Sequence, residues 1–123
     1  MMASELRVNT LKDAAGNNSI ATSFVAGGSA KVWCAFDGTG TIAIRDSFNT
    51  ASITDNNTGI HTVNYTSALV NAEYAVTVSH YESQAQASYN AQATSSVRVD
   101  NRKDDGTFVD VSRNTAVSNG DLA

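Results

Sequence analysis

The chain has 123 residues, of which 41% are hydrophobic and only 7% aromatic, and its formal net charge is −4. This length suits one domain with a modest core, and the acidic balance excludes a basic surface for nucleic acid or for anionic lipid. The single cysteine, Cys34, excludes an internal disulfide. The first residues, MMASELRV, contain no apolar run, so we expect no secretory signal and no membrane anchor.

The first 28 residues are interpreted as an N-terminal arm or docking segment. Residues 6–12 alternate as a short strand, the Gly-Asn residues of 14–18 predict a turn, and residues 19–25 continue in an extended pattern. The pair Gly27-Gly28 predicts a flexible joint before a globular region of residues 29–123. The alternative, in which these residues form the first hairpin of the globular region, stays open.

The most informative stretch is residues 30–49, AKVWCAFDGTGTIAIRDSFN. Val32, Cys34 and Phe36 share one parity, which places them on the core face of a strand, and Trp33 lies on the opposite face. The two glycines of DGTG interrupt the alternation and restart it at residue 41, which predicts a β-hairpin. A hairpin needs partner strands to be stable in water.

Further short strands follow from the same alternation, at residues 60–66, 73–81 and 97–99. Turn signals separate them at DNNTG (55–59) and DDG (104–106), and a return strand is expected over residues 107–113 before a last short strand. Residues 82–96 are polar without an apolar helical face, which predicts a long surface loop or two short edge strands. No substantial helix is expected.

These elements together predict an all-β protein. Short strands with turn signals every 8 to 12 residues are typical of a sandwich or barrel. We expect an antiparallel β-sandwich, jelly-roll-like, of about eight short strands with an extended N-terminal arm. Because small apolar side chains bury little area each, association between copies is expected to supplement the core.

Several motifs resemble the small β domain of tail fibres and other appendage proteins of bacteriophages, marine ones especially. They are the Lys-x-Trp strand at 31–33, the Gly-Thr-Gly turn at 38–41, the Ile-Arg-x-Ser-Phe-Asn segment at 44–49, the Thr-Asp-Asn-x-Thr-Gly turn at 54–59 and the aromatic strand at 63–65. The opening LRVNTLKDAAGNNSI also resembles what precedes this domain in such fibres. The resemblance covers the chain from about residue 4 to its end.

The resemblance implies a virion structural protein of tail fibre type, assembled in the host cytoplasm. It implies a homotrimer that contacts the host surface or an adjoining virion protein, without enzymatic activity, nucleic-acid binding or membrane insertion. Two alternatives stay open: a capsid or tail decoration or adaptor protein that braces other virion proteins, and a free glycan-binding module.

Candidate contact residues lie in polar segments rich in amide and hydroxyl groups, which suit hydrogen bonding to a host glycan or protein. These residues are Asn56, Asn57, Thr58, Gln84, Gln86, Tyr89, Asn90, Asp104 and Asp105. The candidate subunit-interface residues are Trp33, Leu6, Val8 and Phe24, because large apolar side chains dominate such contacts. For Trp33, a platform that stacks on a sugar ring is the alternative.

The sequence points to no cofactor, metal site or catalytic group. His61 and His80 have no neighbouring ligand at a metal-binding spacing, and a zinc site needs three or four protein ligands. Asp37, Asp55, Asp104 and Asp105 occupy turn signals, and no nucleophile motif appears. Cys34 is expected to be a buried small side chain.

Overall fold

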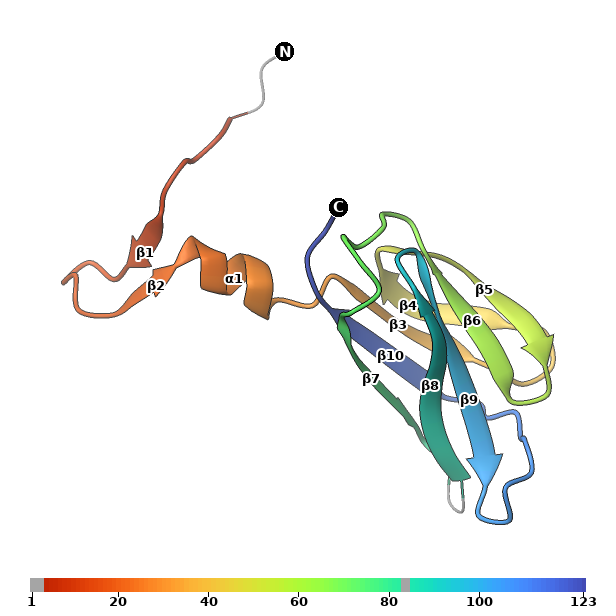
Figure 1. Cartoon of the computed structure of the whole chain (residues 1–123). Helices are drawn as coiled ribbons and strands as arrows, with labels where there is room; N and C mark the ends of the chain where they lie inside the picture. Colours follow the sequence, from red (N-terminus) through yellow and green to blue (C-terminus); the bar gives the residue numbers. More distant parts are fainter. Residues whose placement is uncertain (1–3, 83–84) are drawn as a thin grey trace.

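Two four-stranded antiparallel sheets form the body of the protein in the computed structural model, which describes residues 4–82 and 85–123 (Figure 1). The first sheet has the order β4-β3-β10-β7, formed by Ala43–Phe48, Val32–Asp37, Asn114–Asn119 and Ala75–His80. The second sheet has the order β5-β6-β9-β8, formed by Thr50–Asn57, Ile60–Tyr65, Ser96–Lys103 and Ala85–Ala93. The predicted all-β antiparallel sandwich is confirmed.

Alternation along the central strands builds the core between the sheets. Val32, Cys34 and Phe36 of β3 are buried, as their parity predicted. On the second sheet, Val63 of β6 and Val99 of β9 face them from the other side of the core. Because successive side chains of a strand point to opposite faces, the residues between them lie on the outer faces of the sandwich.

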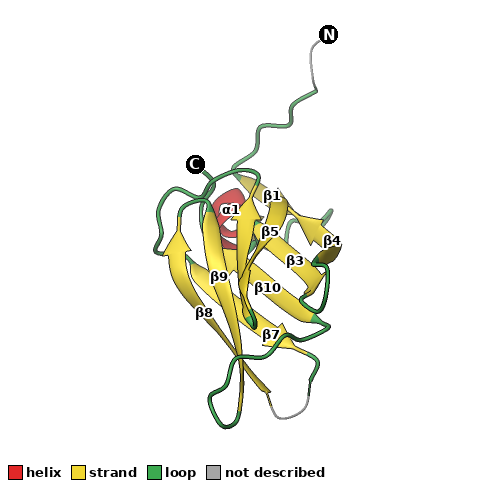
Figure 2. Ribbon diagram, turned by 90° about the vertical axis from the view of Figure 1, so that its right-hand side faces the viewer, coloured by secondary structure: helices red, strands yellow, loops and turns green. Residues whose placement is uncertain are grey.

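The N-terminal residues depart from the predicted extended form. β1 (Thr10–Lys12) and β2 (Ser19–Ala21) form a small hairpin, and the helix α1 (Thr22–Gly28) follows directly. The helix occupies the segment that we expected to be extended and then flexible at Gly27-Gly28, so this expectation was wrong. Its residues are all at least partly exposed, and Figure 1 shows the hairpin and α1 lying to one side of the two sheets. Figure 2, turned by 90°, looks along this direction, so that α1 and the sheets overlap in the view. Residues 4–28 are called the arm below.

Two expectations for the second half of the chain also need correction. The polar segment 82–96 contains one nine-residue edge strand, β8, where we expected a loop or two short strands. The predicted return strand at 107–113 is irregular, with an isolated bridge between Arg102 and Phe108. Around this bridge the N–H of Lys103 donates to the carbonyl of Thr107 and the N–H of Val109 donates to the carbonyl of Asn101, so the start of the segment pairs with the end of β9. Val111 lies beyond this pairing and is buried.

The two ends of the sandwich differ. At the end where the arm attaches, the side-chain amide of Asn49 donates to the carbonyls of Lys31 and Ser67 at 3.1 and 3.0 Å. At the opposite end, called the distal end, the β5–β6 turn and the turn after β9 lie far from α1 (Figure 1). Among the described residues, no helix has the length and apolar character needed to cross a membrane.

Candidate functional site

The turn between β5 and β6 is held rigidly at the distal end. The backbone N–H of Gly59 donates to Oδ1 of Asp110 at 2.6 Å, and the Gly59 carbonyl accepts from the N–H of Asn101 at 2.8 Å. Gly59 has a positive φ of 69°, and a Cβ there would lie 2.6 Å from the nitrogen of Val109. Only glycine fits this position, which explains why the chain turns here. The turn is therefore fixed against residues 101–110.

The turn after β9 is built by side chains that bond their own backbone. Oδ1 of Asp105 accepts from the N–H of Thr107 at 2.9 Å, and the guanidinium of Arg102 lies 4.2 Å from the centre of the Phe108 ring. Hydrogen bonds from the Thr107 hydroxyl and N–H lower the pKa of the Asp105 carboxyl. The carboxylate at the tip is thus held in its charged form, in an ordered turn.

The structure brings most of the candidate contact residues to the distal end. Asn56 and Asn57 were expected in a loop but end strand β5, and Thr58 follows them in the turn. These three residues and Asp104 and Asp105 of the other turn are all exposed. Gly59 is hydrogen-bonded to Asn101, near the end of β9, so both turns lie at the same end of the sandwich. We call the two turns together the distal turn cluster.

The candidates on β8 were expected in a long surface loop or in two short edge strands, and they lie in one nine-residue edge strand. Gln86 pairs with Arg102 and therefore lies toward the distal end. Tyr89 and Asn90 are farther along β8 and, as successive strand residues, point to opposite faces. Gln84 lies outside the described residues. The sequence showed the polarity of this segment but not its pairing with β9, because no apolar alternation marks an edge strand of this kind.

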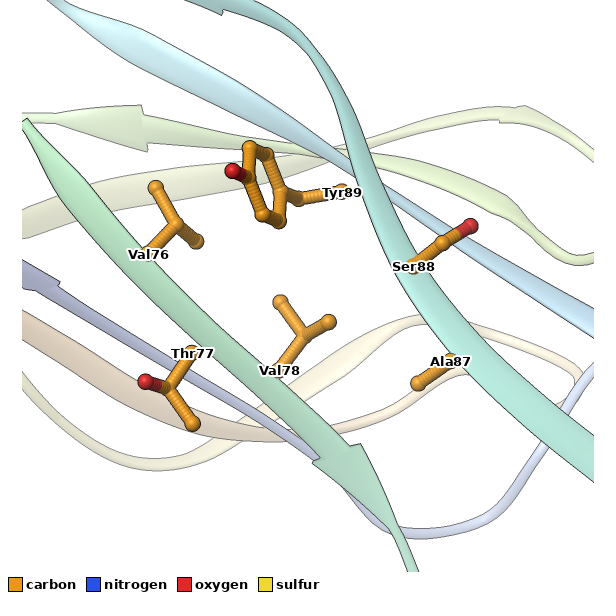
Figure 3. Close-up of a pocket in the computed structure, with 6 residues that line it drawn as sticks. All are labelled: Val76, Thr77, Val78, Ala87, Ser88 and Tyr89. Carbon is orange, nitrogen blue, oxygen red and sulfur yellow. The ribbon is translucent and has the colours of Figure 1, made fainter. Parts of the chain in front are cut away.

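A groove of about 410 Å³ separates the edge strands β7 and β8. Figure 3 shows Val76 and Val78 of β7, together with Ala87 and Tyr89 of β8, pointing into it, whereas Thr77 and Ser88 point away. The Tyr89 ring is half exposed. These lining side chains carry no formal charge, so the groove offers apolar contact and one phenol hydroxyl.

The outer face of the second sheet is polar from one edge to the other. One row in register across its four strands consists of Thr54, Thr62, Arg98 and Asn90. Arg98 donates from Nε and Nη2 to the two carboxylate oxygens of Asp100 at 2.7 and 2.8 Å. This ion pair raises the pKa of Arg98. Sequence reasoning did not single out Arg98 or Asp100, although their i, i+2 spacing on one strand face was a usable signal.

The two histidines occupy different surroundings. His61 is fully buried on β6, with its ring 5.5 Å from that of Phe36 in an edge-on contact. His80 ends β7, and its Nδ1 accepts from the N–H of Glu82 at 3.2 Å. Within residues 4–82 and 85–123, no three His, Cys, Asp or Glu side chains form a group that could hold a metal ion.

The candidate interface residues are all exposed, and they lie on two surfaces. Leu6, Val8 and Phe24 are on the arm, and Trp33 is on the outer face of the first sheet, with 37% of its surface exposed. Phe48, which sequence reasoning did not assign to an interface, is the direct cross-strand neighbour of Trp33. A β-bulge in the β3–β4 pairing shifts the register, so the parity of β4 alone could not reveal this neighbour.

The protein is therefore a sandwich with an arm that exposes apolar side chains at one end and ordered polar turns at the other. No known protein-family model, curated protein or solved structure matches the chain.

Proposed function

We propose that this protein is a structural component of a bacteriophage virion, of tail fibre or appendage type, that acts without catalysis. In this proposal it assembles as a homotrimer and contacts the host surface or an adjoining virion protein. The sequence resemblance to phage appendage domains supports the virion assignment, and the shape and chemistry of the surface support a role in assembly.

The observation that carries the proposal is the arm. Its side chains of Leu6 and Phe24 are 81% and 70% exposed, and its helix lies away from the sandwich (Figure 1). Exposed apolar side chains on a segment that leaves its own domain favour contact with another protein surface. A freely diffusing monomer would gain stability by folding such a segment onto itself, so the arm favours an assembled protein.

The distal turn cluster supports contact at the other end. Its turns are fixed by main-chain and carboxylate hydrogen bonds, so binding through them would cost little conformational entropy. Its exposed groups are amides, hydroxyls and carboxylates, which recognise polar partners. Assembly at the arm end and recognition at the distal end are compatible within one short fibre-like unit.

A second candidate function, a glycan-binding module, is favoured by the outer face of the second sheet. This face carries hydroxyl and amide side chains around the Arg98 guanidinium, whose side chain is 31% exposed, whereas its partner Asp100 is buried beneath it. Such planar arrays of donors and acceptors match the vicinal hydroxyls of sugars. In this case binding would follow the face of the sheet, with Thr62 and Asn90 beside the pair.

Immunogold electron microscopy on particles of the phage that carries this gene tests the main proposal. Label at a tail appendage supports it, label between capsomers supports a decoration role, and absence of label from purified particles contradicts both. A second assay adds the purified protein to host cells and measures how far it reduces phage adsorption. Variants of the two candidate surfaces then show which surface binds the host. Asn57→Ala with Asp105→Ala should abolish competition if the turns bind, and Thr62→Ala with Asn90→Ala should do so if the sheet face binds a glycan.

A further inference from the structure

The outer face of the first sheet carries an apolar row at the end where the arm attaches. Phe48, Trp33, Val117 and Thr77 stand in direct register across β4, β3, β10 and β7. Phe48 is 54% exposed and Trp33 is 37% exposed. The row contains two aromatic rings and no charged group, and it runs across the whole width of the sheet.

A row on the outer face of the second sheet provides a comparison, because it has the polar composition of a face in contact with water. There the four positions in register are Thr54, Thr62, Arg98 and Asn90. An antiparallel sheet with one face in water normally alternates apolar inward and polar outward residues. The Phe48–Trp33–Val117–Thr77 row departs from this rule, whereas the next row on the same face, formed by Asp46, Ala35, Thr115 and Ser79, is mainly polar. A local exposed apolar patch of this kind favours contact with another protein surface.

The arm is the second unpartnered apolar surface, and the chain holds it away from its own sandwich. Beyond Leu6 and Phe24, the exposed large side chains of the arm are Val8, Leu11, Ile20 and Val25. The Lys31 ammonium donates to the carbonyls of Ala26, near the end of α1, and of Ser29, the latter at 2.8 Å. A cation at the carbonyl end of a helix is favourable, so Lys31 fixes the direction in which α1 leaves the sheet.

We propose that the arm of one copy covers the Phe48–Trp33–Val117–Thr77 row of another copy. This inference rests on the self-association in the proposed function and names its two contacting surfaces. The contact can bury only the surface that is still exposed, which is 70% for Phe24, 54% for Phe48 and 37% for Trp33. The exposed aliphatic side chains of the arm add to this area, towards the roughly 800 Å² per partner of a standard interface.

Charge favours the arm over a second sandwich as the occupant of this face. The arm contains two acidic residues, Glu5 and Asp13, and two basic residues, Arg7 and Lys12, so it is neutral. The whole chain has 12 acidic and 8 basic residues, which leaves 10 and 6 for residues 29–123 and a net charge of −4 on the sandwich. Two sandwiches in face-to-face contact would repel each other, whereas a neutral arm meets the sandwich without that cost.

Trp33 is the only tryptophan in the chain, so its fluorescence reports directly on this surface. We expect its emission to shift to shorter wavelength, and its quenching by acrylamide to fall, as the full chain is concentrated from dilute solution. Phe24→Asp should abolish both changes and the oligomer mass in light scattering. Thr54→Asp, on the opposite polar face, should retain them. Phe24 is exposed in its own chain. At a dilution where the wild type is monomeric, circular dichroism should therefore show the same thermal transition in all three proteins.

Three outcomes would overturn the inference. In the first, Trp33 is protected from acrylamide at every concentration and light scattering gives the mass of a monomer. This result means that the arm folds onto its own sandwich. An F24D oligomer that keeps Trp33 protected means that the copies associate through other surfaces, and the proposed function would then survive without this interface. Quenching of Trp33 that is high and equal in wild type and F24D means that nothing covers the row.

Crosslinking separates contact between copies from contact within one chain. A chain with Phe24→Cys is mixed with a chain with Phe48→Cys and treated with a short bis-maleimide. We expect a linked pair of chains in this mixture and none when Phe48→Cys is replaced by Thr54→Cys. Cys34 is 2% exposed and should not react. Linkage confined within single chains of the double variant F24C/F48C would contradict the proposal.

Discussion

The Tyr65 hydroxyl donates a hydrogen bond to the Tyr74 hydroxyl at 2.9 Å and lies 2.9 Å from Oγ of Ser118. Tyr65 belongs to the second sheet and Ser118 to the first, so the phenol joins the two layers inside the core. Burial raises the pKa of both phenols, which keeps them protonated as donors.

Tyr74→Phe should therefore lower the free energy of unfolding by about 1–3 kcal/mol. The change removes the acceptor of Tyr65 and the donor to the carbonyls of Ala93 and Ser96, and buried polar groups without partners are costly. Urea denaturation measures the difference. Tyr81→Phe is the matched control, because the Tyr81 side chain is 76% exposed. Removing its hydroxyl should leave the urea midpoint of unfolding unchanged. Equal midpoints for both variants would contradict this reading of the core.

Gly59→Ala should destabilise the protein more than Gly40→Ala. Both glycines have positive φ, 69° and 59°, so each alanine carries a strain of about 1–2 kcal/mol. At Gly59 the new Cβ would also lie 2.7 Å from the Asn101 carbonyl oxygen, whereas at Gly40 nothing lies within 4 Å. Overpacking of this kind adds about 1–3 kcal/mol. Thermal unfolding of the two variants measures the difference, and equal losses would show that the distal turn is not fixed as described.

Cys34 should be unreactive in the folded protein. Burial raises the pKa of its thiol to about 11, so the nucleophilic thiolate is scarce at pH 8, and the side chain is 2% exposed. A chromogenic disulfide reagent should modify less than one thiol per chain in buffer and one per chain in guanidinium chloride. Rapid modification in buffer would place Cys34 outside the core.

Asp37 should contribute to stability in a pH-dependent way. Hydrogen bonds from the Thr39 hydroxyl and N–H, followed by Arg45, lower the pKa of its carboxyl. A lowered folded-state pKa means that the contribution is complete above the unfolded pKa, near 4, and is lost as the pH falls through the folded value. Thr39→Val should raise the pKa of Asp37, observed by NMR titration of its carboxyl carbon, and reduce the stability lost between neutral and acid pH. An unchanged titration would contradict the role of Thr39.

Much of the sandwich could be predicted from alternation alone. The parity of Val32, Cys34 and Phe36 gave the correct core face of β3, and the alternation over residues 60–66 indicated β6, whose His61, Val63 and Tyr65 are buried. These strands are central in their sheets, so burial on one face determines their sequence. The Asp-Asn-Asn-Thr-Gly motif indicated the β5–β6 turn, although the strands continue to within two residues of each other.

The errors at α1 and at residues 107–113 have different causes. Residues 22–28 contain Thr, Val and two glycines, all poor helix formers, yet they form α1, whose last turn accepts hydrogen bonds from Ser29 and Lys31. The segment 107–113 alternates like a strand but pairs with the end of β9 only around Phe108, and its buried Val111 lies beyond that pairing. The candidate contact turns were found from their polarity, whereas the Trp33–Phe48 neighbourhood depended on a bulge that the sequence does not reveal.

The molar mass of the full chain in solution tests the central claim, that copies of this protein associate. Multi-angle light scattering across a concentration series should give the mass of three chains of 12.9 kDa each, dissociating on dilution together with the loss of Trp33 protection. A constant mass of 12.9 kDa at the highest concentration reached would contradict the account.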